Sequence, residues 1–193
     1  KIQLSVYDCT GCSNCADVCP SKNKALIMKP FETQLAEAER WTYMHEKVGY
    51  KDTIVDKFVN VKNSQFAQPL FEFSGACAGC GETSYIKAIT QLFGDRMIVS
   101  NATGCSSIYG GSAPSTPYTF NKSGHGVAWA NSLFEDNAEY GLGISLGSNK
   151  LRERISLRMK DAVGTVNPET KAAFEEWLAG MKNAEASKVA TAK

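Results

Sequence analysis

The sequence predicts a mixed α/β fold in two parts, a small α+β unit that carries a run of cysteines and, after a connector, part of a parallel α/β domain. Two observations support this prediction. Residues 9–20 read CTGCSNCADVCP, with four cysteines close together. Further along, an amphipathic helical pattern over 82–93 precedes a short apolar strand pattern over 97–99 and a glycine-containing loop, an order typical of parallel α/β folds.

Size and composition narrow the class of protein. The 193 residues suffice for one ordinary domain, and a hydrophobic content of 43% suits a globular core. A net charge of +1 gives no indication of a nucleic-acid partner. The sequence contains no run of about 18 apolar residues, so it predicts no membrane-spanning helix. Seven cysteines without a secretory signal favour a reducing compartment, and we expect the cytoplasm.

The first part of the fold is expected over residues 1–30. Ile2, Leu4 and Val6 alternate as in a short strand that leads into the cysteine loop, and Ala25–Met28 is interpreted as the return strand. Residues 31–64 are mixed and charged, and we interpret them as a connector in which residues 36–40 favour helix.

The spacing C-x2-C-x2-C-x3-C-P is that of the bacterial ferredoxin ligand run, whose fourth cysteine ligates the other cluster in two-cluster ferredoxins. It predicts that Cys9, Cys12 and Cys15 bind one [4Fe–4S] cluster and that Cys19 binds its neighbour. A disulfide framework suits small secreted domains, and zinc usually takes paired C-x2-4-C clips. Both alternatives fit this run less well.

The second part is expected over residues 65–193. The helix over 82–93 should stop at Gly94, and the strand over 97–99 should end in a Gly-Cys-Ser-Ser turn. Ligands gather at the carboxyl ends of strands in such folds. The remaining predictions are a loop over 114–126, a helix over Trp129–Ala138, a tight turn over Gly141–Gly147, a helix over Asn149–Ala162, a last helix capped by Asn167 and begun by Pro168, and a frayed end.

A second set of cysteines lies in this part. Cys77 and Cys80 form a C-x2-C clip just before a helix, and Cys105 follows 25 residues later. A redox-active dithiol and a zinc clip both remain possible for the clip alone, whereas the three together favour another [4Fe–4S] cluster. Three clusters need twelve thiolates, and seven are present. We therefore expect this chain to be an internal piece of a longer polypeptide that supplies the missing ligands.

Three blocks of sequence carry a family resemblance. FVNVKNSQFAQPLFEFSGACAGCGETSY (58–85), NATGCSSIYGGSAPSTPY (101–118) and GVAWANSLFEDNAEYG (126–141) closely resemble pyruvate:ferredoxin oxidoreductase. They match the stretch that joins its two-cluster ferredoxin domain to its thiamine diphosphate domain, and the resemblance extends over nearly the whole chain.

The resemblance implies a particular fold and activity. Residues 1–30 would be the second half of a two-[4Fe–4S] ferredoxin-like domain, 31–64 a linker, and 65–193 the N-terminal part of a thiamine-diphosphate-binding parallel α/β domain. The parent enzyme would oxidatively decarboxylate pyruvate with coenzyme A, giving acetyl-CoA and CO2. Electrons would pass through three [4Fe–4S] clusters to ferredoxin or flavodoxin. Thiamine diphosphate and Mg²⁺ are the implied cofactors, and a homodimer without nucleic acid or membrane partners is the implied assembly.

The resemblance also assigns residues. Cys77, Cys80 and Cys105 would hold the cluster nearest the thiamine, and Glu82 and the Cys105 turn would lie against that cofactor. In the first turn of a helix, the helix dipole favours an ionised carboxylate such as that of Glu82. The sequence lacks the GDG and downstream Asn that hold magnesium and diphosphate in thiamine enzymes, so this piece alone is expected neither to bind thiamine well nor to turn over.

Two other classes of function stay open at this point. One is a stand-alone electron-transfer protein in which a half-ferredoxin is fused to a cluster-carrying α/β module. The other is a zinc-stabilised binding module. Within the oxidoreductase class, a 2-oxoacid other than pyruvate remains an alternative substrate, because the keto-acid pocket is expected outside this chain.

Overall fold

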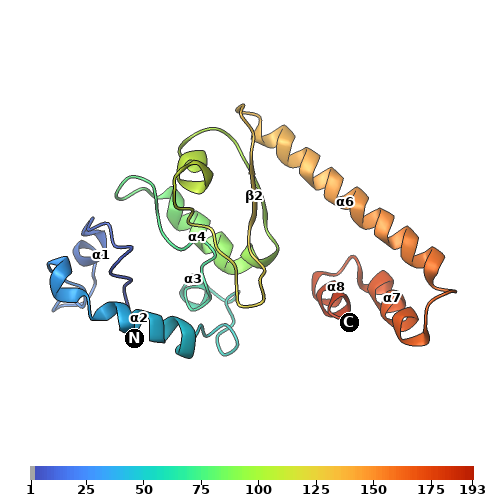
Figure 1. The fold of residues 1–193 in the computed structure, drawn as a ribbon, viewed down its shortest axis with the longest axis horizontal. Helices are drawn as coiled ribbons and strands as arrows, with labels where there is room; N and C mark the ends of the chain where they lie inside the picture. Colours follow the sequence, from blue (N-terminus) through green and yellow to red (C-terminus); the bar gives the residue numbers. More distant parts are fainter. Residues whose placement is uncertain (1–2) are drawn as a thin grey trace. The chain divides into compact units, whose positions relative to one another are not determined.

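The computed structural model describes residues 3–193. The chain divides into two compact units, Lys1–Asn137 and Ala138–Lys193. The N-terminal unit holds both cysteine sets and two short strands, and the C-terminal unit is helical (Figure 1). The described chain is therefore a mixed α/β protein, and the predicted boundaries at residues 30 and 64 stay predictions.

The N-terminal unit contains short helices before its first strand. They are α1 (Asn14–Asp17), the 3-10 helix η1 (Phe31–Gln34), α2 (Glu37–Tyr43), the π-helix η2 (Met44–Val48), α3 (Val61–Ser64), α4 (Glu82–Phe93) and the 3-10 helix η3 (Gly94–Arg96). The predicted helices over 36–40 and 82–93 are confirmed by α2 and α4.

The two strands form a small parallel sheet. Strand β1 (Ile98–Asn101) pairs in register with β2 (Ala128–Asn131), so that Ile98 lies opposite Ala128. The Asn101 side chain donates to Asn131 Oδ1 at 2.8 Å, which joins the carboxyl ends of the strands. Because parallel strands need a crossover between them, the intervening chain holds α5 (Cys105–Ser107) and the π-helix η4 (Ile108–Ser112). The predicted parallel α/β arrangement is thus confirmed for two strands.

An aromatic core supports this sheet. Phe71 is 2% exposed and meets Tyr109 and Tyr118 edge to face, with ring centroids 6.0 and 5.2 Å apart. Backbone hydrogen bonds hold the Phe71 segment against the 117–119 segment, from Glu72 to Pro117 at 2.8 Å and from Thr119 to Leu70 at 3.2 Å. Such edge-to-face pairs favour one fixed arrangement of the rings.

The C-terminal unit is built from three helices. These are α6 (Asn137–Ala162), whose first residue belongs to the other unit, α7 (Pro168–Gly180) and α8 (Ala184–Thr191). Arg152 of α6 lies over the Trp177 ring at 5.0 Å and donates to Met181 O and Ser187 Oγ. The predicted cap is confirmed, because the Asn167 side chain accepts from the Thr170 amide at 2.8 Å.

Two strands predicted near the N-terminus are not formed. Residues 3–6 have no strand structure, and Ile2 lies outside the described residues. Ala25–Met28 is likewise irregular. A strand needs a neighbour that completes its hydrogen bonds, and the only strand pair in residues 3–193 is β1–β2. The apolar pattern over 97–99 corresponds to a strand because β2 pairs with it, whereas the described residues offer no partner strand to 3–6 or 25–28.

Three further predictions in the second half were wrong. Trp129 lies in β2 instead of a helix, because its segment pairs with β1. Gly141–Gly147 lies inside α6 instead of a turn, although each interior glycine disfavours a helix by about 1 kcal/mol relative to alanine. The end of the chain forms α8, capped by the Asn183 side chain, which accepts from Ala186 at 3.0 Å.

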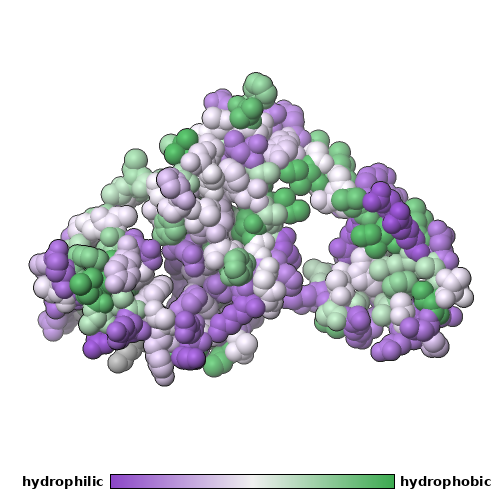
Figure 2. Space-filling view, viewed as in Figure 1, coloured by the Kyte–Doolittle hydropathy of each residue, from purple (hydrophilic) through white to green (hydrophobic). Residues whose placement is uncertain are grey.

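Many large apolar side chains remain at the surface. Val18, Ile54 and Leu133 are each more than three-quarters exposed, and on α6 Leu142 is 61% exposed. Figure 2 shows such hydrophobic residues among hydrophilic ones on the visible face of both units. Exposed apolar surface on this scale is typical of chains that contact other protein surfaces. Across residues 3–193, the structure contains no helix that is both long and apolar enough to cross a membrane.

Candidate iron–sulfur and cofactor site

All seven cysteines lie in the N-terminal unit as free thiols. Cys19 and Cys80 are partly exposed, and the other five are exposed. The structure therefore offers thiols that are accessible to a metal centre and forms no disulfide between them. Thiolates are the ligands that zinc and iron–sulfur clusters prefer.

The first run lies on a loop that turns tightly. Gly11 and Ser13 have positive φ angles of 70° and 62°, and α1 follows with Cys15 on it. Lys24 Nζ donates to Ala16 O and Asp17 O at the end of α1, at 3.0 and 2.8 Å. These turns present successive thiols from one short loop, as a cluster-binding run requires.

Cys19 has a distinct environment within this run. The backbone amide of Ser21, followed by that of Leu26, lowers the pKa of the Cys19 thiol. Hydrogen bonds to a charged form favour it, and the thiolate is the metal-ligating form of cysteine. Backbone geometry therefore assists Cys19 as a ligand.

The second set lies on two loops, one before α4 and the other after β1. Cys77 and Cys80 precede α4, and the Cys80 amide donates to Cys77 O at 3.0 Å across a turn in which Gly79 has a φ of 77°. Cys105 opens α5 shortly after β1 ends. The prediction that the Cys105 turn lies at the carboxyl end of a strand is confirmed.

The two cysteine loops lie close to each other. A Cβ atom placed on Gly79, between Cys77 and Cys80, would be 3.9 Å from Asn14 Nδ2 on α1. Asn14 lies between Cys12 and Cys15 of the first run. The structure thus brings the Asn14 side chain of the first run near the Gly79 backbone of the second set, a relation that their separation in sequence does not reveal.

The donor chemistry fits iron–sulfur clusters, but the thiols are not gathered into a closed shell. Within residues 3–193, no three His, Cys, Asp or Glu side chains are grouped closely enough to hold one metal ion. Cluster ligation by the seven cysteines therefore stays a prediction. It requires the cysteine side chains and their loops to close around the cluster, together with ligands from beyond these seven.

Glu82 lies in the first turn of α4, as predicted, and is exposed. Its Oε1 accepts a hydrogen bond of 3.1 Å from the hydroxyl of Tyr109, a residue that the sequence analysis did not single out. Burial, and then the hydrogen bond to Glu82 and its charge, raise the pKa of Tyr109. The phenol therefore remains a proton donor to the carboxylate. No pattern in the sequence marks Tyr109, since its only signal is its place four residues after Cys105.

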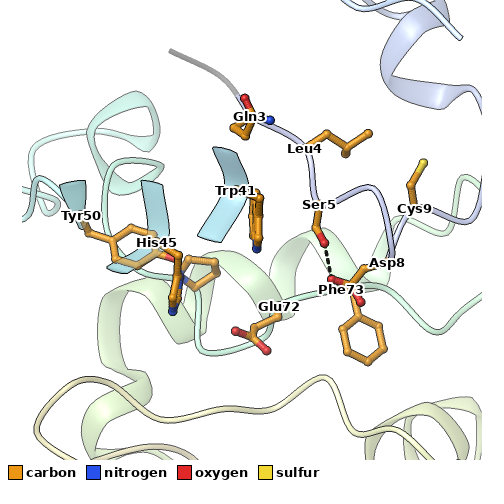
Figure 3. Close-up of a pocket in the computed structure, with 11 residues that line it drawn as sticks. Gln3, Leu4, Ser5, Asp8, Cys9, Trp41, His45, Tyr50, Glu72 and Phe73 are labelled. Atoms are coloured by element: carbon orange, nitrogen blue, oxygen red, sulfur yellow. Dashed lines mark hydrogen bonds between the residues drawn. The ribbon is translucent and has the colours of Figure 1, made fainter. Parts of the chain in front are cut away.

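A pocket of about 370 Å³ adjoins the first run (Figure 3). Asp8 and Cys9 line one side, and His45, Tyr50 and Glu72 line the other. Burial raises the pKa of Glu72, the Asp8 charge adds to this rise, and the His45 charge opposes it. Charged groups around the pocket are therefore coupled next to a predicted cluster ligand.

Comparisons with known proteins agree with the resemblance seen in the sequence. No protein-family model matches the chain. The chain is 54% identical to a pyruvate:ferredoxin oxidoreductase of Moorella thermoacetica and 52% identical to a pyruvate-flavodoxin oxidoreductase of Enterobacter agglomerans, each over 97% of this chain. It is also 52% identical, over 80% of its length, to a pyruvate dehydrogenase [NADP(+)] of Cryptosporidium parvum.

Two sets of free thiols on the loops of a mixed α/β fold are typical of iron–sulfur electron-transfer proteins. The chain belongs to the pyruvate:ferredoxin (flavodoxin) oxidoreductase family, as its sequence predicted. It spans 16% of the length of the first two relatives, so it corresponds to one segment of them.

Proposed function

We propose that this segment carries iron–sulfur ligands and part of the thiamine diphosphate site of an enzyme that oxidises pyruvate. The observation that carries the proposal is the 54% identity over 97% of the chain to a pyruvate:ferredoxin oxidoreductase. The free thiols at Cys9–Cys19 and at Cys77, Cys80 and Cys105 support it, because their residue type and exposure suit cluster ligation.

The proposed reaction converts pyruvate and coenzyme A into acetyl-CoA, CO2, one proton and two electrons. The bond between the keto carbon and the carboxylate breaks, the coenzyme A sulfur bonds to the keto carbon, and the thiol proton is released. The two electrons pass one at a time through three [4Fe–4S] clusters to ferredoxin or flavodoxin. Pyruvate is preferred over other 2-oxoacids because the relatives' names specify it.

The proximity of the two cysteine loops supports this electron route. Cys77, Cys80 and Cys105 would hold the cluster nearest the oxidation site, and Cys9, Cys12 and Cys15 would hold the next, with Cys19 serving its neighbour. Asn14 and Gly79 lie near each other between the two sets. Short gaps between the loops would give the clusters neighbouring positions without a separate docking step.

Glu82 is the residue of this chain that would meet thiamine diphosphate. When bound, that cofactor would supply the group that takes up the negative charge left as CO2 departs. The exposed Glu82 carboxylate, next to the Cys105 turn, would accept a hydrogen bond from it. Mg²⁺ and the diphosphate would be held by residues outside this segment. We further propose a homodimer located in the cytoplasm.

The test uses the natural polypeptide that carries this segment, purified without oxygen. We expect ferredoxin and flavodoxin reduction that depends on both pyruvate and coenzyme A, with iron and acid-labile sulfide in equal amounts. Cys77→Ser should lower the iron content by about one cluster, since one [4Fe–4S] cluster loses a ligand. Ser74→Ala, an exposed change in the same loop, is the matched control.

Two results would contradict the proposal. One is zinc in place of iron, with no visible absorption, which selects a zinc-stabilised module. The other is full iron occupancy in the isolated 193-residue chain, which favours a stand-alone electron-transfer protein.

A further inference from the structure

Tyr109 lies four residues after Cys105 and has no role in the function proposed above. It is 3% exposed and belongs to η4, the π-helix that directly follows the Cys105 helix α5. Its hydroxyl reaches out to Glu82 on α4. One buried side chain therefore joins the segment after Cys105 to the segment after Cys80.

The Tyr109 ring is held firmly in place. Phe71 meets it edge to face at 6.0 Å. A Cβ atom on Gly75 would come within 2.8 Å of Tyr109 Cβ, so glycine allows the 75 backbone to approach the base of the Tyr109 side chain closely. Gly75 lies two residues before Cys77. Because the side chain is buried and closely packed, its hydroxyl group has little freedom to move away from Glu82.

The fixed hydroxyl constrains an otherwise exposed carboxylate. Tyr109 donates to Glu82 Oε1 at 3.1 Å, and among the described residues no hydrogen bond engages Glu82 Oε2. A side chain with three rotatable bonds would otherwise sample several rotamers in water. The hydrogen bond leaves Glu82 with one satisfied oxygen and one oxygen open to a donor group of a ligand.

We propose that Tyr109 is a positioning residue that orients the Glu82 carboxylate toward an N–H or O–H donor of thiamine diphosphate. The inference rests on the proposed function. Tyr109 itself touches no cofactor atom in this proposal and acts through Glu82. A pre-oriented acceptor strengthens binding because less conformational freedom is lost when the ligand arrives.

The experiment removes only the hydroxyl, with Tyr109→Phe, in the natural polypeptide that carries the segment. Tyr85→Phe is the matched control, because Tyr85 lies on α4 three residues after Glu82, is exposed, and its hydroxyl makes no hydrogen bond to Glu82 in the described structure. We measure the thiamine diphosphate dissociation constant by calorimetry, together with iron content and the electron paramagnetic resonance spectrum of the reduced clusters.

We expect Tyr109→Phe to weaken thiamine diphosphate binding roughly tenfold, as for loss of one hydrogen bond to a charged group, with iron and spectrum unchanged. Tyr85→Phe should bind as the natural protein does. In a double-mutant cycle, Tyr109→Phe should have no further effect once Glu82→Ala is present, because alanine leaves no acceptor for the Tyr109 hydroxyl. A purely structural role for Tyr109 would instead give additive effects.

Three outcomes would overturn the inference: unchanged binding in Tyr109→Phe, additive effects in the cycle, or loss of iron in Tyr109→Phe. Failure of the natural polypeptide to bind thiamine diphosphate at all would instead overturn the proposed function.

Discussion

The two cysteine sites differ in how much packed structure holds them. From residue 3 to residue 60, a span that includes Cys9–Cys19, Val6 is the one buried residue. The second site rests on the buried Phe71 and Tyr109 and on β1 paired with β2. The first site is formed by backbone turns, and the second is formed by a core.

This difference indicates how each site depends on its metal. A loop with little buried surface gains little free energy from its own packing, so binding of the proposed cluster would supply a large part of its folding free energy. The second site has a framework that can persist without metal. We therefore expect cluster removal to loosen the Cys9–Cys19 loop more than the segments around Cys105.

The largest expected effect comes from Phe71→Ala. Removing a fully buried phenylalanine typically costs about 3–5 kcal/mol, and Tyr109 and Tyr118 would both lose their central partner. Hydrogen exchange of the 193-residue chain should show lost protection in α4 and β1. In the first site, Val6→Ala removes two methyl groups and should cost about 1–2 kcal/mol. Equal losses for both variants would mean that the two sites are packed alike.

A smaller effect is expected from adding a methyl group at glycine. A Cβ atom on Gly111 would lie 2.4 Å from Trp129 Cζ3, so Gly111→Ala must displace a ring of the second framework, at a cost of about 1–3 kcal/mol. In the first site, Gly11 has open space around it but a φ of 70°. Gly11→Ala should therefore cost about 1 kcal/mol through backbone strain alone. Urea unfolding measures both, and the reverse ranking would contradict the comparison.

Sequence patterns predicted the parts of the fold that depend on local chemistry. The helix over 82–93, the Asn167 cap and the strand before Cys105 all rest on short-range signals, and all three are confirmed. The three sequence blocks over 58–85, 101–118 and 126–141 led to the right family, whereas the cluster ligands that the cysteine spacings indicate stay a prediction.

The patterns failed where distant residues decide. Trp129 is drawn into β2 by β1, some thirty positions earlier. On α4, the apolar Tyr85 and Ile89 are exposed, whereas the polar Thr90 and Gln91 are buried. The Gln91 amide donates to Ala67 O at 3.0 Å, which makes its burial possible. Periodicity identified the helix, but it did not tell which face would be covered.

The first site should respond to the loss of one side chain from its loop. Lys24 Nζ donates to two carbonyls at the end of α1, and cations there stabilise a helix terminus. Lys24→Met keeps the length of the side chain and removes the donor, and it should cost about 0.5–1 kcal/mol. Faster hydrogen exchange confined to residues 14–24 would confirm the effect. Lys22→Met, a neighbouring exposed change, is the control, and equal exchange in both variants would contradict it.

The smallest expected effect concerns the pocket that is lined by Cys9 of the first run and by Glu72, the residue after Phe71. Burial raises the pKa of Glu72 above its ordinary 4.5. A carboxyl with a higher pKa in the folded than in the unfolded state binds more protons when folded, so stability falls as pH rises above 4.5 toward the folded pKa. Glu72→Gln removes this loss, and its gain at pH 7 should be only a few tenths of a kcal/mol because water still reaches much of this partly desolvated side chain.

Urea unfolding of Glu72→Gln between about pH 4 and pH 7 tests the sign. The variant and the natural chain should be equally stable at the acid end, and the variant should gain progressively toward neutral pH. Glu46→Gln removes an exposed carboxylate of η2 that does not line the pocket, so it controls for the loss of one charge. Parallel curves for Glu72→Gln and the natural chain would show that the carboxylate is as well solvated in the pocket as in the unfolded chain. The pocket around Glu72 would then be as accessible to water as the exposed Cys9–Cys19 loop.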